Sequence, residues 1–170
     1  RAEIEILPDR SRRTEAVDPD DHHLYVSLGC AAENLAIAAG AKGRPADVTI
    51  ESEPEPRINI ALGNGRPLDE TLYQAIPLRQ STRSAYDGKP ISSNDIGLLS
   101  AAAQQDGVSV LIFTGATERK AISEFVVEGN SAQMDDPAFV AELRDWLRFT
   151  PNMAISNGDG LFSACSGNPV

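Results

Sequence analysis

The chain has 170 residues, of which 41% are hydrophobic and 24% are charged, which is typical of a soluble globular protein long enough for one domain with a core. Its 15 basic and 25 acidic residues give a net charge of −10, which argues against a nucleic-acid binder because such proteins present a basic face. No apolar run approaches the roughly 20 residues needed to span a bilayer, so we expect no membrane insertion.

The first expected elements are a strand and a long helix. Residues 3–7 alternate acidic and apolar side chains, which is the pattern of a half-buried strand. After a polar loop, Asp18 and Pro19 predict a helix start, with Asp18 as the cap and Pro19 at the first helical position. Apolar residues then recur every three or four positions to about Gly40, and the small residues around Cys30 predict a buried thiol that serves packing.

Two strands and a short helix are expected next. The runs "DVTIES" (47–52) and "RINIAL" (57–62) predict strands, and the prolines of "EPEP" between them suit a connection. The stretch "GNGRPL" (63–68) has two glycines of a dinucleotide-binding fingerprint but lacks the third and carries Pro67 where a helix should open. We interpret it as a turn, followed by a short helix over 69–76.

Further along, residues 92–105 predict a helix capped by Ser92 or Ser93. The run "VSVLIFT" (108–114) is the most apolar in the chain and predicts a strand at the centre of a sheet. The next helix is expected to end at Gly129, a plausible C-cap.

The last expected helix begins at Asp136 and Pro137, which repeat the pattern of a cap followed by proline. Its apolar face consists of Phe139, Val140, Leu143, Trp146 and Leu147. Residues 149–170 show no clear periodicity, and the interpretations of an ordinary long connection and of a loop that covers a site both stay open. Because strands and helices do not alternate strictly, the expected class is α+β.

Few of the chemical motifs that a sequence can reveal are present. His22 and His23 are adjacent, so on a helix they point about 100° apart and do not form a metal-binding pair. Cys30 and Cys165 cannot form a disulfide framework, and no histidine near Cys165 in the sequence would activate its thiol. We therefore expect no metal and no catalytic residue among these groups.

The segment from Ala75 to Gly88 gathers positive charge and hydroxyl groups on one short connection. Arg79 and Arg83 flank Ser81 and Thr82. A phosphate is held by charge-assisted donors, hydroxyls and free backbone N–H groups, and this connection supplies all three. The alternative is a basic surface loop whose ion pairs each contribute only about 0–1 kcal/mol. Spacing alone supports the two interpretations equally.

The run "LRQSTRSAYDGKPISSNDIGLLSAAAQ" resembles the opening segment of the nitroreductase family of flavoproteins, in which a basic-x-Ser-x-basic cluster precedes an aromatic–Asp pair and a helix. In that family the cluster binds the phosphate of FMN. The resemblance therefore implies that Arg79, Gln80, Ser81 and Arg83 contact the FMN phosphate, while Thr82 matches the motif without an assigned role.

A wider resemblance covers nearly the whole chain. The runs "EIEILPDRSRRTEAVDPDDHHLYVSLGCAAENLAIAA", "GNSAQMDDPAFVAELRDWLRF" and "GDGLFSACSGNP" are similar to a longer, Acg-like subgroup of nitroreductase-like proteins, some of which carry twin-arginine export signals. In this subgroup one chain mimics a homodimer through two related halves. The resemblance implies helices around a mixed, mostly antiparallel sheet, with residues 1–74 finishing the first half and 75–170 opening the second.

The resemblance also implies that this chain is a fragment. Further flavin contacts are expected before Arg1 and after Val170, so the remainder of the chain or a second copy would complete the flavin site. The implied location is bacterial, either periplasmic after twin-arginine export or cytoplasmic.

The implied function is an FMN-dependent oxidoreductase that takes hydride from NAD(P)H and reduces a small acceptor such as a nitroaromatic or a quinone. The alternative is a flavin-binding or flavin-sequestering protein with little turnover. A further alternative is a structural domain whose basic loop binds nothing.

Overall fold

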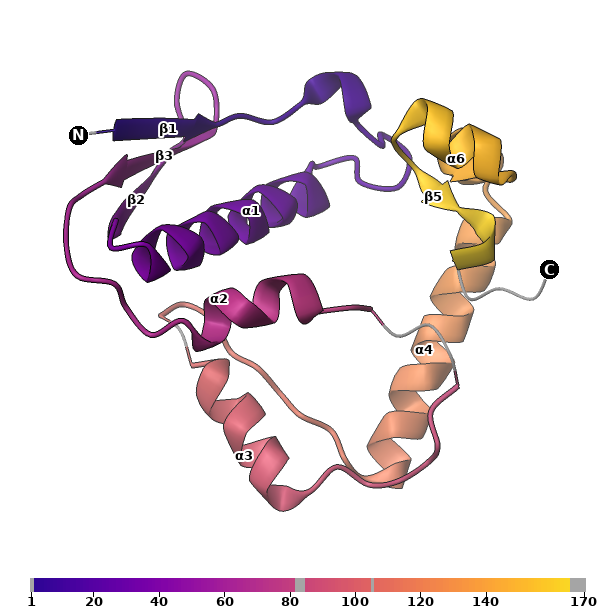
Figure 1. Cartoon of the computed structure of the whole chain (residues 1–170). Coiled ribbons are helices and arrows are strands. Elements are labelled where there is room, and N and C mark those ends of the chain that lie inside the picture. The colour runs from indigo at the N-terminus through magenta and orange to yellow at the C-terminus, as the bar shows by residue number, and fades with distance from the viewer. Residues whose placement is uncertain (1, 82–84, 105, 166–170) are drawn as a thin grey trace. The chain divides into compact units, whose positions relative to one another are not determined.

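The computed structural model describes residues 2–81, 85–104 and 106–165, and its fold is mixed α+β, as predicted (Figure 1). The chain divides into two compact units, Arg1–Thr82 and Arg83–Val170, and each is described by itself. The boundary of 74 and 75 implied by the resemblance falls inside the first unit. Whether the units correspond to two related halves stays a prediction.

The first unit is built on a three-stranded antiparallel sheet. Strands β1 (Ala2–Ile6) and β2 (Ala46–Glu51) both pair with the central strand β3 (Arg57–Leu62), so the order is β1-β3-β2. All three strands lie within a few residues of the predicted ranges. The register sets Ile60 between Ile4 and Val48, and because side chains alternate along a strand, the isoleucine, leucine and valine side chains of the sheet fall on one face.

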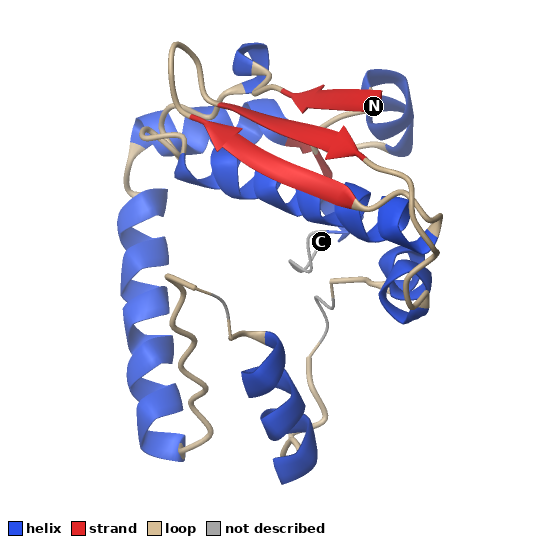
Figure 2. Ribbon diagram, turned by 90° about the vertical axis from the view of Figure 1, so that its left-hand side faces the viewer, coloured by secondary structure: helices blue, strands red, loops and turns tan. Residues whose placement is uncertain are grey.

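The long helix α1 (His22–Ala41) covers that apolar face, and Figure 2 shows it lying against the three strands. Its Ala32 packs with the buried Ile58 and Ile60 of β3. The partly buried residues around this cluster are Ile6, Leu28, Leu35, Ala46 and Leu62. The predicted strands and helix therefore form the core of the first unit.

The opposite face of the sheet is charged. It carries carboxylates from both edge strands, and Arg57 on β3 lies between them. The Arg57 guanidinium donates a hydrogen bond from Nη1 to Glu5 at 2.9 Å, and its Nε lies 3.6 Å from a carboxylate oxygen of Glu51. These interactions raise the pKa of Arg57, chiefly through the hydrogen bond to Glu5. Arg57 thus connects the two edge strands across the central one.

The start of α1 differs from the prediction. The helix begins at His22, not after Asp18, and Asp21 occupies the N-cap position with a positive φ of 58°. Asp18 still serves the helix, because its carboxylate accepts hydrogen bonds from the backbone N–H groups of His23 and Leu24, each at 3.0 Å. The predicted N-cap position and the predicted helical start at Pro19 are therefore wrong. Asp18 nevertheless accepts hydrogen bonds from the first turn of the helix, as a capping side chain does.

Helix α1 also bears on the expectation about membranes. Among the described residues it is the one helix long and apolar enough to cross a bilayer, with a mean hydropathy of 1.3 over 18 residues. The expectation from the sequence that no apolar run approaches the length of a membrane span was therefore wrong for this helix. A core helix of a soluble protein passes the same test, and α1 packs on the sheet, so this property does not identify a span.

The first unit also contains short helical elements. A 3₁₀ turn, η1 (Arg10–Arg12), lies between β1 and α1, and α2 (Thr71–Ala75) occupies the predicted position of the short helix. A second 3₁₀ turn, η2 (Ile76–Leu78), follows α2 directly. The predicted turn at 63–68 contains no helix or strand, since β3 ends at Leu62.

The second unit is mostly helical. Its elements are α3 (Ser93–Ala102), α4 (Ala116–Met134), α5 (Pro137–Trp146), β4 (Leu147–Arg148), α6 (Pro151–Asn157), β5 (Leu161–Phe162) and η3 (Ser163–Cys165). Two predicted caps are confirmed: Ser92 Oγ accepts from the N–H of Asp95 at 3.1 Å, and Asp136 accepts from Ala138 at 2.8 Å. The predicted apolar face of α5 contains its buried residue, Phe139.

Helix α4 runs past Gly129, so the predicted end there is wrong. A glycine inside a helix costs only about 1 kcal/mol relative to alanine and does not by itself terminate the helix. Helix α4 ends where Asp136 adopts extended backbone, with φ −88° and ψ 114°. The residue before a proline disfavours helical geometry, so Pro137 explains the end better than Gly129 does.

The predicted central strand over 108–114 is also wrong. Residues 109–114 lie outside any helix or strand, and Val110 and Leu111 are 53% and 76% exposed. A strand needs a neighbour to pair its backbone, and within the described residues no strand pairs with this run. Strong apolar character therefore did not suffice to form a strand here.

The end of the second unit contains regular structure that the sequence analysis missed. Thr150 caps α6, Pro151 opens it and Gly158 ends it with a positive φ of 65°. Strands β4 and β5 form a two-residue parallel pair, and the buried Arg148 donates to Asp159 at 2.7 and 3.1 Å. Gly160 is required between them, because a Cβ there would lie 2.5 Å from the carbonyl oxygen of Trp146. Residues 149–162 thus contain a helix and a strand and are not one long irregular connection.

We expect Ile60→Ala to destabilise the protein by about 2–5 kcal/mol, because this side chain is fully buried at the centre of the sheet and its truncation leaves a cavity. Urea unfolding would measure the change. The matched control is Ile50→Ala, since Ile50 points to the same face but is 76% exposed, and it should cost less than about 1 kcal/mol. Equal losses for the two variants would contradict this packing.

Candidate functional site

The predicted phosphate-binding residues begin immediately after η2. Arg79 has extended backbone, with φ −66° and ψ 129°, and its N–H donates to the carbonyl of Ala75 at 3.0 Å. Arg79, Gln80 and Ser81 are all exposed, and their side chains make no hydrogen bond or ion pair with a described residue. Their guanidinium, amide and hydroxyl donors are therefore available to a ligand.

Arg83 and Thr82 lie outside the described residues, so the predicted approach of Arg79 and Arg83 to a common anion stays a prediction. Downstream, the aromatic–Asp pair belongs to a turn. Tyr86 is 82% exposed, while Asp87 accepts from the backbone N–H of Lys89 at 3.0 Å and pairs with its ammonium at 2.7 Å. These contacts, the side-chain hydrogen bond first, lower the pKa of Asp87.

Arg79 differs from most other arginines of the first unit. Those held by carboxylates are Arg10, Arg12, Arg13 and Arg57, and Arg44 donates to a backbone carbonyl. Arg66 and Arg79 alone among the described arginines of this unit have no such partner. On an acidic chain, an unpaired guanidinium is a candidate for binding an anion.

A second polar cluster surrounds the start of α1 and was missed by the sequence analysis. The buried carboxylate of Asp21 accepts hydrogen bonds from Arg13 at 2.7 Å and from Arg10 at 3.1 Å. Arg10 also donates to the hydroxyl of Tyr25 at 3.1 Å. The signal in the sequence that could have predicted this cluster was the group of arginines just before the aspartate-rich start of the helix. Since the charges pair with one another, we assign the cluster to stabilising this end of α1.

Asp18 completes the same cluster and is only 5% exposed. Burial by itself would raise the pKa of its carboxyl group. The backbone hydrogen bonds from His23 and Leu24, together with the electrostatic attraction of the His23 and His22 side chains, outweigh burial and lower this pKa. The N–H groups at the start of α1 are therefore occupied by a carboxylate of the chain itself and are not open to a bound anion.

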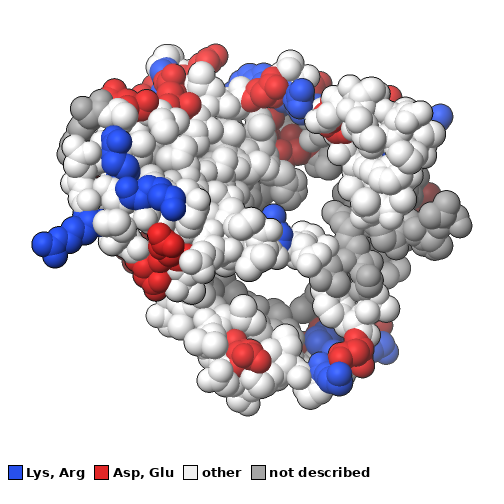
Figure 3. All heavy atoms as spheres, viewed as in Figure 1, with Lys and Arg blue, Asp and Glu red and all other residues white. Residues whose placement is uncertain are grey.

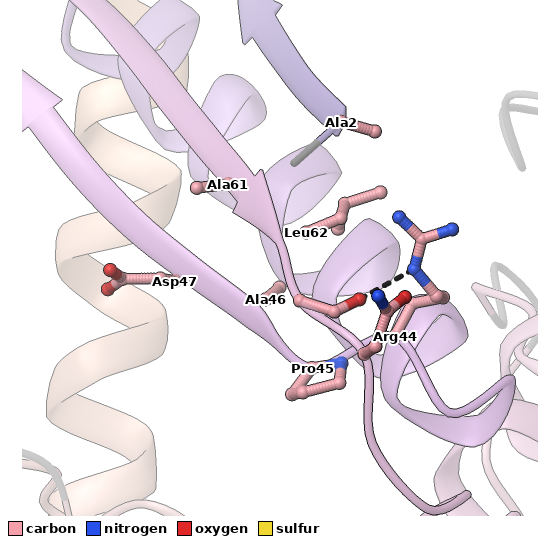
Figure 4. Close-up of a pocket in the computed structure, with 9 residues that line it drawn as sticks. Ala2, Arg44, Pro45, Ala46, Asp47, Ala61 and Leu62 are labelled. Carbon is pink, nitrogen blue, oxygen red and sulfur yellow. Dashed lines mark hydrogen bonds between the residues drawn. The ribbon is translucent and has the colours of Figure 1, made fainter.

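Two of the pockets in the first unit have the size and lining of a small-ligand site. A polar one of about 500 Å³ is lined by Ala2, Arg44, Pro45, Ala46, Asp47, Ala61, Leu62, Gly63 and Asn64 (Figure 4). A mainly apolar one of about 310 Å³ lies between Tyr25 and Leu28 of α1 and Ile50 and Ile58 of the sheet. The sequence analysis identified neither, because both depend on residues that only the fold brings together.

The cysteine and histidine side chains offer little chemistry. Cys30 is exposed, so the prediction of a buried thiol is wrong: the small residues beside it face solvent while Ala32 contacts the sheet. Cys165 is also exposed. The rings of His22 and His23 lie edge to face at 5.4 Å, and no set of metal-binding side chains occurs in the described ranges.

No family model, no curated protein and no solved structure is significantly similar to this chain. The resemblance to the nitroreductase family therefore rests on the sequence runs quoted above.

We expect Asp18→Asn to lower stability at neutral pH, because the buried carboxylate accepts two backbone hydrogen bonds that a neutral amide oxygen replaces only in part. Because the pKa of Asp18 is lowered in the folded protein, this stabilisation is present above the unfolded-state pKa of about 3.9 and is lost as the pH falls through the folded-state pKa.

Urea midpoints of the two proteins should therefore converge in acid. Glu33→Gln, at an exposed position of α1, is the control and should track the unmodified protein. A difference between Asp18→Asn and the unmodified protein that is the same in acid as at neutral pH would contradict this role of the carboxylate.

Proposed function

We propose that this chain is part of an FMN-dependent oxidoreductase of the nitroreductase type, in which Arg79, Gln80, Ser81 and Arg83 hold the FMN phosphate. One observation carries the proposal: Arg79, Gln80 and Ser81 are consecutive, exposed and free of side-chain partners among the described residues, whereas most other arginines of the first unit are engaged. The finer fold, a nitroreductase-like arrangement with two related halves, is part of the same proposal.

The donors present fit a phosphate group. The Arg79 guanidinium can give two parallel N–H bonds to phosphate oxygens, and the Ser81 hydroxyl and Gln80 amide add neutral donors. The extended backbone after η2 leaves N–H groups of this segment outside a helical ladder. Bound FMN would supply hydride acceptance from NAD(P)H and onward transfer to a small acceptor such as a nitroaromatic or a quinone. The role of these residues is to anchor and orient the cofactor.

The double variant Arg79→Ala with Arg83→Ala should weaken FMN binding at least about tenfold, because a charge-assisted hydrogen bond contributes roughly 1.5–3 kcal/mol and 1.4 kcal/mol is a factor of ten. Quenching of FMN fluorescence on titration with the protein measures the affinity. Arg12→Ala is the control, since Arg12 pairs with Asp9 and belongs to no proposed phosphate site. Unchanged affinity in the double variant, or an equal loss in Arg12→Ala, would reject the assignment.

Turnover is a separate property, because a flavin-sequestering protein would use the same phosphate contacts. Addition of NAD(P)H without oxygen to the FMN-loaded protein distinguishes the two. The oxidoreductase is expected to lose the visible flavin absorption band within seconds to minutes, and a nitroaromatic or quinone should restore it. If the band persists, the protein binds flavin without being reduced by NAD(P)H. That result would reject the oxidoreductase and favour the flavin-sequestering protein.

A further inference from the structure

Two loops of the first unit share the tripeptide Gly-Arg-Pro, at 43–45 and at 65–67. They lie side by side at one end of the sheet, where the N–H of Gly65 donates to the carbonyl of Gly43 at 2.9 Å. Gly43 has a positive φ of 71°, and a Cβ there would lie 2.9 Å from the carbonyl oxygen of Gly65. This close approach fixes one arginine on each loop at the same end of the sheet.

Arg44 is held by one of its nitrogens and leaves the other two available. Its Nε donates to the carbonyl of Gly63 at 2.6 Å, and neither terminal nitrogen has a partner among the described residues. Figure 4 shows the guanidinium beside Leu62, while the carboxylate of Asp47 points away from it. The guanidinium is thus oriented by the backbone at the rim of the polar pocket without being neutralised by an acidic side chain.

Two further cations lie on the same loops. Arg66 is exposed and unpaired in the described part of the chain, and Lys42 is exposed with its ammonium 4.6 Å from the centre of the Tyr73 ring. Figure 3 shows basic side chains gathered at this end of the sheet, at the left of the view. The nearby Asp69 is engaged instead by the backbone N–H and hydroxyl of Thr71, at 2.9 and 2.7 Å.

We propose that these two loops form a binding site for a phosphate monoester, with the terminal nitrogens of Arg44 bonding the phosphate oxygens and Arg66 and Lys42 contributing charge. An arginine fork matches a phosphate in two parallel hydrogen bonds, and three unneutralised cations favour a dianion over a carboxylate. The pocket volume of about 500 Å³ is in the range that holds small organic ligands, so it has room for the esterified group as well as the phosphate. The site contains none of the residues proposed to bind FMN.

Titration of the isotope-labelled protein with glycerol phosphate, followed by NMR at constant ionic strength, tests the site. We expect saturable shifts of the Arg44 Nε–H signal and of the backbone amide of Asn64. A parallel titration with inorganic phosphate distinguishes the sources of the group: weaker binding of the free ion supports an organic ligand, and equal binding supports phosphate itself as the ligand.

Arg44→Gln should weaken the binding at least about tenfold, because it removes the charged fork. Arg66→Gln should weaken the binding several-fold. It removes no hydrogen bond or ion pair to a described residue, so it provides the test if Arg44→Gln unfolds the protein. Arg12→Gln is the control, because Arg12 pairs with Asp9 elsewhere and its loss should leave binding unchanged. The absence of saturable shifts, or equal binding by Arg66→Gln and the unmodified protein, would overturn the proposal.

Discussion

Burial of the central strand β3 is the constraint on which the first unit depends. Ile58 and Ile60 are paired on both sides and covered by α1, so a register shift by one residue would expose the apolar face and bury the charged one. That register also fixes the ends of the sheet. It brings residues 42–45 and 63–67 together, and it sets the place from which the chain leaves toward α2 and Arg79.

The distribution of arginine follows from this arrangement. Arg10, Arg13 and Arg57 pair with carboxylates where they stabilise the start of α1 or the charged face of the sheet. Those without carboxylate partners lie where the chain leaves the sheet, on the loops at one end and after η2. In a protein with a net charge of −10, these positions are where an anion can be recognised by local donors and not by the overall field.

Features set by neighbouring residues could be predicted from the sequence. The alternating strands, the long helix and the caps at Ser92 and Asp136 depend on local periodicity and short-range hydrogen bonds, and the structure confirms them. Features that depend on distant partners could not be. The run 108–114 has the composition of a strand but no pairing strand in the described ranges, and Arg44 becomes a candidate only when the fold brings Gly63 against it. Arg79 was identified by a family resemblance, since spacing alone left its role open.

Phosphorus NMR of FMN mixed with the protein tests the central claim most directly, because it observes the group that Arg79, Gln80, Ser81 and Arg83 are proposed to hold. The account predicts that the phosphate signal shifts and broadens as the protein is added, and that the signal of free FMN returns when the two arginines are replaced by alanine. A phosphate signal that stays at its free position while the protein binds the flavin would show that the cofactor is anchored elsewhere and would contradict the account.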